Sequence, residues 1–390
     1  MEKSAAKGGL NAMDLARIRE RFPLLGRFVY LNHSAIGPLS IAVREAVGEA
    51  LEAQAEGSVG YPVWRDRIAP LKERIARLIG ASPAEIALVR NTVEGLSTVA
   101  SGVLWREGDN VVTNDMEFPA NIYPWMNLEV RYGVNTRLVK THDGKVAVDD
   151  IIAACDERTR LVTVSFVQFS NGYRADVESL GAFCRERGIY FCVDAIQGLG
   201  VLRLRVDRTP IDFLASGAHK WLLAPLGIGF LYVRQALQPE LWPCEVGHLS
   251  VQQNTENYTD YALNFRPSAE KYEGGVHNYP GAFGFHESLK LFEEVGMDCI
   301  EERVLMLTDQ LCDGLRSGGY RLLSHRSPAE KSGTVSFRSD THSSEDVFVR
   351  LKEAKIITSL REGAIRVAPH FYNTPEEIER FLAALPSHRC

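Results

Sequence analysis

The stretch VESLGAFCRERGIYFCVDAIQG, residues 177–198, decides the fold class. Its first half repeats apolar residues at helical spacing, and Gly188 follows as a residue suited to end a helix. Its second half contains IYFCVDA, which is almost continuously apolar, as strands covered on both faces of a sheet are. A helix followed directly by such a strand predicts an α/β domain with a mostly parallel sheet.

The same alternation extends on both sides of this stretch. TVEGLSTVASGVL, residues 92–104, has helical spacing, with Thr92 in the place of an N-cap. Helices between consecutive strands cover both faces of a sheet, and ligands then bind at the carboxyl ends of the strands. The other strand candidates are residues 86–91, 110–115, 136–141, 160–167, 212–218 and 228–234.

After about residue 265 the pattern changes to two long helices, over 281–296 and 298–317, followed by short strands and helices. The last helix begins at TPEE, with Thr374 as N-cap, Pro375 at its first position and Glu377 completing a capping box. We expect a large α/β domain over 21–265 and a smaller α+β domain over 266–390. Residues 1–20 are expected to pack against one of the two, with the small domain as our assignment.

Charge and cysteine content limit the partners and the compartment. The chain has 44 Lys and Arg against 50 Asp and Glu, a net charge of −6, and no basic stretch that would favour nucleic acid. Its seven cysteines form no C-x-x-C pair, which argues against a zinc ribbon or a disulfide framework, and we expect no metal. No signal-peptide pattern opens the sequence, and the uncharged run 221–233 is too short to span a bilayer. We therefore expect a cytoplasmic protein without a membrane partner.

Polar residues follow several of the predicted strands. Asp194 ends the apolar strand of the opening stretch, and His219 and Lys220 come just after another strand. Thr92 stands where a strand meets a helix, a place whose free N–H groups favour a phosphate, and Gln168 follows a further strand. Lysine and aspartate are rarely buried without a partner, so a ligand at this edge of the sheet would explain them.

A single cofactor accounts for this set. Pyridoxal phosphate needs a lysine for a Schiff base, an acid at its pyridine nitrogen, a phosphate cradle and a flat group over its ring. Lys220, Asp194 and Thr92 supply the first three. Each residue alone has an ordinary alternative, respectively a solvated side chain, a strand-end cap and a helix cap. Their joint occurrence in α/β order predicts the cofactor.

Four segments carry a family resemblance: YLNHSAIGPLS from residue 30, VDAIQGLG from 193, HKWLLAPLGIGFLYV from 219 and RVAPHFYNTPEEI from 366. They resemble the fold type I pyridoxal-phosphate enzymes of the class V aminotransferase group, which includes cysteine desulfurases, isopenicillin N epimerase-like proteins and, more distantly, kynureninases. The resemblance covers nearly the whole chain. It implies a homodimer with active sites near the subunit interface, acting on the α-carbon of an amino acid through an external aldimine and a quinonoid.

The resemblance also implies residue roles. Lys220 would be the Schiff-base lysine and then the base at Cα, Asp194 would pair with the pyridine nitrogen, and Arg366 would grip the substrate carboxylate, with Arg361 near enough to share that role. The other implied cofactor contacts are Gln197 at the ring hydroxyl, Phe118 stacked on the ring, Thr92, the backbone of Val93 and His219 at the phosphate, and Gln168 at a strand end.

Four further positions are weaker matches. His33, Trp64 and His248 fall in segments that line the substrate mouth in the resembling proteins, so we expect them to bind substrate, although each could equally be structural. In EGGVHN, Val276 replaces the usual threonine of a loop that reaches the partner subunit's phosphate, so one hydroxyl contact is missing from the implied dimer.

The reaction is the least determined part. Cysteine desulfurases carry a nucleophilic cysteine just before the carboxylate arginine, but here KIITSLREGAIRVAP has none, and nothing connects Cys390 to the site. Phe118 stands where desulfurases have an acid–base histidine, and kynureninases share the phenylalanine but have tyrosine in place of His219. We expect transamination first. The alternatives are a C–S lyase without a persulfide cysteine, an epimerase, a kynureninase-like hydrolase, or a cofactor-binding protein that has lost catalysis.

Overall fold

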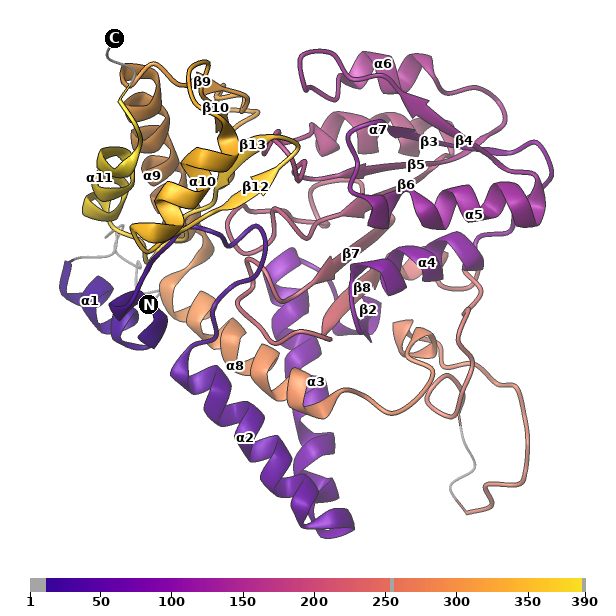
Figure 1. Cartoon of the computed structure of the whole chain (residues 1–390). Coiled ribbons are helices and arrows are strands. Elements are labelled where there is room, and N and C mark those ends of the chain that lie inside the picture. The colour runs from indigo at the N-terminus through magenta and orange to yellow at the C-terminus, as the bar shows by residue number, and fades with distance from the viewer. Residues whose placement is uncertain (1–11, 253–255, 388–390) are drawn as a thin grey trace, which may run out of the picture.

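The computed structural model describes residues 12–252 and 256–387 (Figure 1). Its centre is a seven-stranded sheet with the order β2-β8-β7-β6-β5-β3-β4, in which β8 alone runs antiparallel to its two neighbours. The mostly parallel sheet predicted from the sequence is therefore confirmed. The strands are β2 (Ile86–Val89), β3 (Asn110–Asn114), β4 (Asn135–Val139), β5 (Thr159–Ser165), β6 (Tyr190–Asp194), β7 (Phe213–Gly217) and β8 (Gly229–Val233).

Side chains alternate between the two faces of this sheet, and each face has its own apolar cluster. Val193 packs into the cluster that includes α3 (Tyr61–Ile79), α7 (Val177–Arg187) and α8 (Tyr279–Val295). The next residue towards the amino end, Cys192, packs into the cluster with α4 (Thr92–Gly102) and α5 (Tyr123–Tyr132). Burial on both faces explains why these strands are continuously apolar.

Two predicted helix ends can be compared with the structure. Gly188 ends α7 with a left-handed conformation (φ 66°), as expected. Thr92, predicted as an N-cap, is instead the first residue of α4, and Asn91 caps that helix because its Oδ1 accepts a hydrogen bond from the N–H of Glu94 at 3.0 Å. The correction moves Thr92 into the first turn, where its side chain is available for other contacts.

The second sheet has four antiparallel strands in the order β12-β13-β10-β9, with β11 set apart from it. The short strands expected after the two long helices include β11 and β12, which Thr358 separates, and the capping box of Thr374 and Glu377 at the last helix is confirmed. The elements are β9 (Arg321–Leu322), β10 (Val335–Arg338), β11 (Ile356–Ile357), β12 (Ser359–Arg361), β13 (Ala364–Val367), α9 (Met297–Ser317), α10 (Ser344–Glu353) and α11 (Pro375–Ala384).

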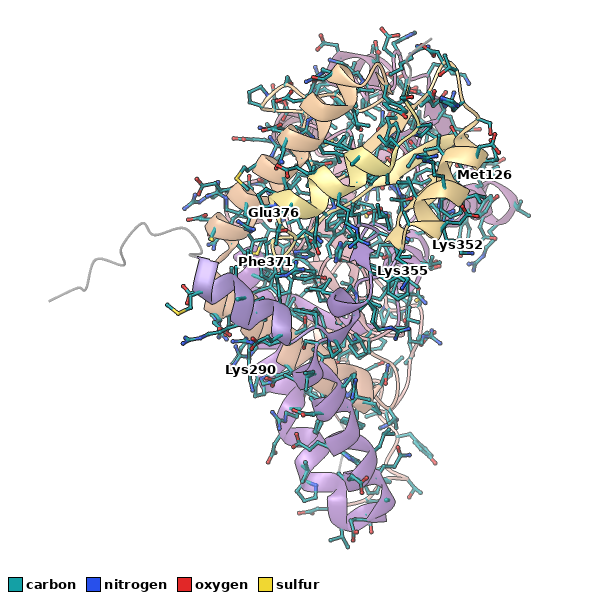
Figure 2. The ribbon with its side chains drawn as sticks, turned by 60° about the vertical axis from the view of Figure 1, so that its left-hand side comes forward. Met126, Lys290, Lys352, Lys355, Phe371 and Glu376 are labelled. Atoms are coloured by element: carbon teal, nitrogen blue, oxygen red, sulfur yellow. The ribbon has the colours of Figure 1, made fainter. Side chains whose placement is uncertain are left out.

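The domain limits at 21–265 and 266–390 stay a prediction, and two kinds of contact cross them. β1 (Val29–Tyr30) pairs in parallel with β11 of the small domain. α8 packs on α2 (Ile41–Ala55) and α3 of the large one, and the three helices project together beyond both sheets (Figures 1 and 2). Arg19 of α1 (Ala12–Glu20) bonds Glu377, whereas the assignment of residues 1–20 to the small domain stays a prediction and residues 1–11 lie outside the described part.

The remaining turns of helix are short 3-10 segments at Pro23–Gly26, Gly57–Gly60, Pro83–Glu85, Pro119–Asn121, Gln235–Leu237 and Ala269–Tyr272, and α6 covers Val148–Ala153. In the described part of the chain, no helix is both long and apolar enough to cross a membrane.

Candidate active site

Lys220 lies in a cavity of about 290 Å³ between the carboxyl ends of the parallel strands and the small sheet. Sequence analysis anticipated Phe118, Gln197, Arg361 and Arg366 beside it, and the structure brings all four into the cavity wall. It assigned no role to four other lining residues, three of which lie in the quoted segment YLNHSAIGPLS. These are Ser34, Ala35, Ile36 and Phe169.

The backbone around Lys220 is held tightly. The N–H of Gly37 donates to the carbonyl oxygen of His219 at 2.8 Å, and a methyl group at Gly37 would overlap the carbonyl oxygen of Lys220. Two residues past Trp221, Leu223 adopts φ 54°, a left-handed conformation that costs a branched side chain energy and is tolerated only where the surroundings impose it. The lysine is thus fixed by the segment that contains Gly37, which explains the glycine in GPLS.

Asp194 and Lys220 form the electrostatic centre of the site. Asp194 is 2% exposed at the end of β6, and its Oδ1 accepts a bond from the N–H of Ile196 at 3.0 Å. Burial and the nearby Glu117 raise the pKa of Asp194 to about 7, although Lys220 opposes this shift. Burial lowers the pKa of Lys220 to about 8; Asp194 works against the shift, and Arg366 and Arg361 add to it. The amine therefore loses its proton far more readily than a solvated lysine.

Glu117 is a buried carboxylate that sequence analysis did not single out, although it directly precedes Phe118. It is 7% exposed and accepts hydrogen bonds from the side chain of Gln168 at 2.8 Å and from the N–H of Ser165 at 2.7 Å. Asn114, Asn121 and the Ser165 hydroxyl donate to it as well. This network joins the ends of β3 and β5 and holds Gln168 beside Asp194's strand.

Phe118 presents an aromatic face to the cavity. It is 45% exposed, its ring lies edge-to-face with Phe169 at 5.2 Å, and Nζ of Lys220 is 5.7 Å from its centroid. A ring that is half open and close to the amine fits the predicted stacking role better than a core position, because a core phenylalanine would be covered.

Two arginines face the lysine from the small sheet. Arg366 is 2% exposed, and its Nη1 donates to the carbonyl oxygen of Phe169 at 2.6 Å while its Nε donates to Ser359 Oγ at 3.2 Å. Burial and the neighbouring Arg361 lower its pKa to about 10. Arg361 is exposed at the mouth, and within the described residues its guanidinium bonds only the carbonyl oxygen of Leu360. A fixed inner guanidinium and a free outer one can bind carboxylates at two depths.

Gln197 is held on both sides of its amide. Its Nε2 donates to the carbonyl oxygen of Ser34, and its Oε1 accepts from the indole N–H of Trp221, each at 3.0 Å. Two buried oxygens, Ser34 Oγ and Gln168 Oε1, have no hydrogen-bond partner within the described residues. Orphaned buried polar atoms beside Lys220 and beside the Glu117 network are what a site built for a polar ligand would contain.

The phosphate side lies at the start of α4. Thr92 Oγ1 accepts a bond from the N–H of Gly217 at 2.9 Å, which ties this helix to the end of β7. The first turn offers free N–H groups to an anion, Val93 among them. His219 is half-buried and neutral, because burial and Lys220 lower its pKa to about 4. Val276 is 75% exposed and lines a neighbouring opening with Arg90 and Glu94.

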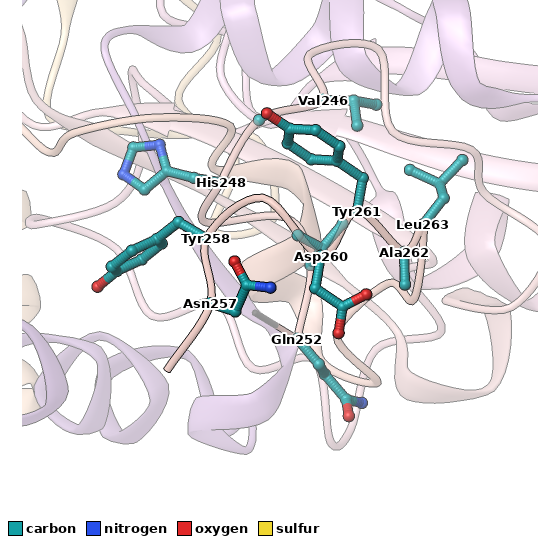
Figure 3. Close-up of a pocket in the computed structure, with 11 residues that line it drawn as sticks. Val246, His248, Gln252, Asn257, Tyr258, Asp260, Tyr261, Ala262 and Leu263 are labelled. Atoms are coloured by element: carbon teal, nitrogen blue, oxygen red, sulfur yellow. The ribbon is translucent and has the colours of Figure 1, made fainter. Parts of the chain in front are cut away.

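Three predicted substrate residues are not brought into this cavity. His33 is fully buried, with Nδ1 at 2.7 Å from the carbonyl oxygen of Ala368 and Nε2 against the Tyr372 hydroxyl, so its ring holds the two domains together. Trp64 stacks on Tyr279, where α3 meets α8. His248 is exposed beside a separate cavity of about 490 Å³ between residues 246 and 263 (Figure 3). None of the three lines the cavity around Lys220, and their role in substrate binding stays a prediction.

The arrangement fits pyridoxal phosphate. One edge of the sheet holds an amine that loses its proton readily, a buried acid on the adjacent strand and a half-exposed aromatic ring. It also holds two buried oxygens without hydrogen-bond partners and the start of a helix. Structural roles alone do not explain all of these features together. Fold and site thus define a fold type I pyridoxal-phosphate enzyme.

The chain belongs to the aminotransferase class-V family, whose model matches residues 64–381. It is 31% identical to a probable cysteine desulfurase of Methanothermobacter thermautotrophicus, over 93% of this chain and 95% of that protein. It is 27% identical to the uncharacterized aminotransferase YcbU of Bacillus subtilis, over 92% and 94%. The apo cysteine desulfurase of Thermococcus onnurineus NA1 superposes with a TM-score of 0.87 at 26% identity, covering 97% of this chain and 98% of the other.

Proposed function

We propose that this enzyme cleaves the carbon–sulfur bond of a cysteine-derived α-amino acid by β-elimination and releases the sulfur product directly. The observation that carries the proposal is the hairpin before Arg366. β12 and β13 are joined by Glu362 and Gly363 alone, at φ 48° and 68°, which leaves no loop on which a sulfur-accepting cysteine could stand. No cysteine of the described residues lines the cavity around Lys220, and Cys390 lies outside them. The similarity to proteins named as cysteine desulfurases supports a reaction at a carbon–sulfur bond.

The chain's own residues supply the carboxylate-binding and proton-accepting groups of this reaction. Arg366 would bind the α-carboxylate and so turn the Cα–H bond towards Lys220, whose neutral amine takes the proton. The bound cofactor supplies an electron sink for the charge that develops at Cα. The Cβ–S bond then breaks with its electron pair leaving on sulfur, and the released dehydro-amino acid hydrolyses to a 2-keto acid and ammonia.

Transamination is the second candidate. Lys220 is the one amine in the cavity wall of the described chain, and a single base of this kind can also carry a proton between two carbons of the same adduct. The YcbU relative, named as an aminotransferase, favours the same outcome. Phe118 cannot donate a proton, so neither candidate can use a second acid at that position.

A product assay tests the proposal. The purified holoenzyme is incubated with cysteine, cystine and non-sulfur amino acids, with and without a 2-keto acid. Release of sulfide or thiol with pyruvate in the absence of an acceptor supports elimination, and turnover that requires the keto acid rejects it in favour of transfer. Lys220→Ala should abolish both the reaction and the yellow absorption of the lysine-bound cofactor. A protein that stays colourless with added cofactor would contradict the whole assignment.

Two further proposals concern assembly and compartment. We infer a homodimer, because the phosphate side opens to the surface at Val276 and Val93, both exposed and apolar. Light scattering on the holoenzyme tests it, and a monomer at assay concentration would contradict it. The six described cysteines are free thiols, which supports a reducing compartment such as the cytoplasm.

A further inference from the structure

One face of the small sheet carries a row of exposed arginines, most of which have no role in the reaction proposed above. Arg361 on β12 pairs with Ala364 on β13, and Arg338 on β10 pairs with Arg321 on β9. The register of β10 with β13 ends at Phe337 opposite Ile365, so its next pair is Arg338 opposite Ala364. Arg361, Arg338 and Arg321, the arginine row, thus cross all four strands in one line.

This row lies on the same face as Arg366. Side chains two residues apart point to one side of a strand, and Arg366 stands two residues beyond Ala364. The opposite face carries Phe337, Ile365 and Val367, which pack into the apolar cluster that includes α10. The face with four arginines is therefore the one turned towards the large domain and Lys220.

The arginine row lacks counter-charges. Among the described residues, no carboxylate lies within ion-pair distance of its three guanidinium groups, which bond only backbone oxygens, Arg338 at Glu362 and Arg361 at Leu360. Like charges directly opposite each other on neighbouring strands repel, so the Arg338–Arg321 pair costs stability. A bound anion would remove that cost.

A cavity large enough for such an anion lies against the row. It has a volume of about 480 Å³, is lined by all three arginines and by Ser170, Asn171 and His325, and falls within the usual size of small-molecule sites. Asp143 and Glu362 also reach its wall, so the three arginines outnumber the carboxylates by one. We call this cavity the anion groove. Arg361 lines both the anion groove and the cavity of Lys220, so the two spaces adjoin.

We propose that this groove binds a second anionic group at the far end of the substrate's side chain. The inference rests on the proposed function only in placing the amino-acid end of the substrate at Lys220 and Arg366. From there, a tail would pass Arg361 and end at Arg338 and Arg321, whose planar guanidinium groups suit a carboxylate, sulfonate or phosphate. The substrate class is an amino acid with an extended, anionic sulfur substituent rather than cysteine itself.

The test compares paired ligands that differ only in the charge of the tail. S-carboxymethyl-cysteine and its carboxyethyl and carboxypropyl homologues are each matched with the neutral carboxamide. Binding is measured from the first change in cofactor absorbance on rapid mixing with the holoenzyme, before turnover. The variants are Arg321→Gln with Arg338→Gln, and Lys352→Gln as a control that removes one exposed charge from α10 (Figure 2).

At one tail length or more, the wild type should bind the acid about tenfold more tightly than the amide, as expected for charge-assisted hydrogen bonds. The double variant should lose this preference while the Lys352→Gln variant keeps it. Equal binding of acid and amide at every length, a preference that survives in the double variant, or binding of cysteine but of no tailed ligand would each overturn the inference. If no thiol is released but the acid preference persists, the elimination proposal fails and the anion groove stands.

Discussion

Nη1 of Arg366 donates a hydrogen bond of 2.6 Å to the carbonyl oxygen of Phe169, and this bond joins the small sheet to the segment after β5. One guanidinium therefore serves two purposes. It positions the small domain over the cavity, and its remaining N–H groups are those that would bind the substrate carboxylate in the proposed role. The same bond fixes Phe169, which in turn packs against Phe118.

Arg366→Lys should separate binding from cofactor loading. Lysine keeps the charge but cannot make the two-pronged contact, so the KM for the amino acid should rise about tenfold or more while the cofactor absorption stays unchanged. Steady-state kinetics and an absorption spectrum measure the two effects. Arg316→Lys, at an exposed ion pair on α9, is the control. An unchanged KM would show that Arg366 does not bind the carboxylate.

Gly37→Ala should damage the lysine segment without touching a catalytic group. The added methyl group would overlap the carbonyl oxygen of Lys220 and press on Leu223, so the backbone must shift. We expect cofactor affinity to fall by an order of magnitude or more, since small displacements of a reacting group have large effects. Equilibrium dialysis of the apo protein with pyridoxal phosphate measures it. Gly26→Ala has open space around its new methyl group and should bind cofactor as the wild type does.

The lowered pKa of Lys220 should appear as a pH dependence of cofactor capture. Only the neutral amine reacts with the aldehyde, so the capture rate of the apo protein should rise with pH and level off above about 8, rather than near the ordinary 10.5. Between these values the unfolded chain binds more protons than the folded one, so this lysine makes the apo protein more stable as pH rises through that window. Arg361→Gln removes a nearby positive charge and should move the levelling-off to higher pH. A profile that still climbs above pH 10 in the wild type would contradict the assigned pKa.

Phe118→Ala should weaken cofactor binding far more than folding. The ring is 45% exposed and its described aromatic contact is Phe169 alone, so its loss should cost less than about 1 kcal/mol of unfolding free energy. Without the stacked ring, cofactor affinity should fall about tenfold, the equivalent of a good aromatic contact. Urea unfolding measures the free energy of unfolding, and equilibrium dialysis measures the cofactor affinity. A large loss of stability with normal cofactor affinity would instead make Phe118 a core residue.

Features with a local signal could be predicted from the sequence. The strands, the capping box at Thr374 and the strand-end positions of Asp194 and Lys220 all follow from short-range patterns and from the rule that parallel strands end at one edge. His33 could not be placed, because its partners Ala368 and Tyr372 are more than three hundred residues away in the chain. The cap at Asn91 was missed because two adjacent residues were both good caps, and only the backbone conformation decides between them.

Glu117→Gln tests the residue that the sequence did not reveal. The carboxylate accepts five hydrogen bonds, whereas glutamine offers one acceptor oxygen and would turn its NH2 group against donors such as the Asn121 amide and the Ser165 hydroxyl. Leaving buried donors unpaired should cost about 3 kcal/mol in the free energy of unfolding, measured with urea.

The loss of the negative charge of Glu117 should also lower the pKa of Asp194, whose pKa Glu117 helps to raise. The Asp194 carboxylate would then stay ionised down to a lower pH, which a pH titration of the holoenzyme spectrum should detect. Glu157→Gln, at an exposed turn, should change neither quantity. If the glutamine variant unfolds at wild-type urea concentrations and its spectrum titrates unchanged, the network around Glu117 is not what holds this edge of the sheet.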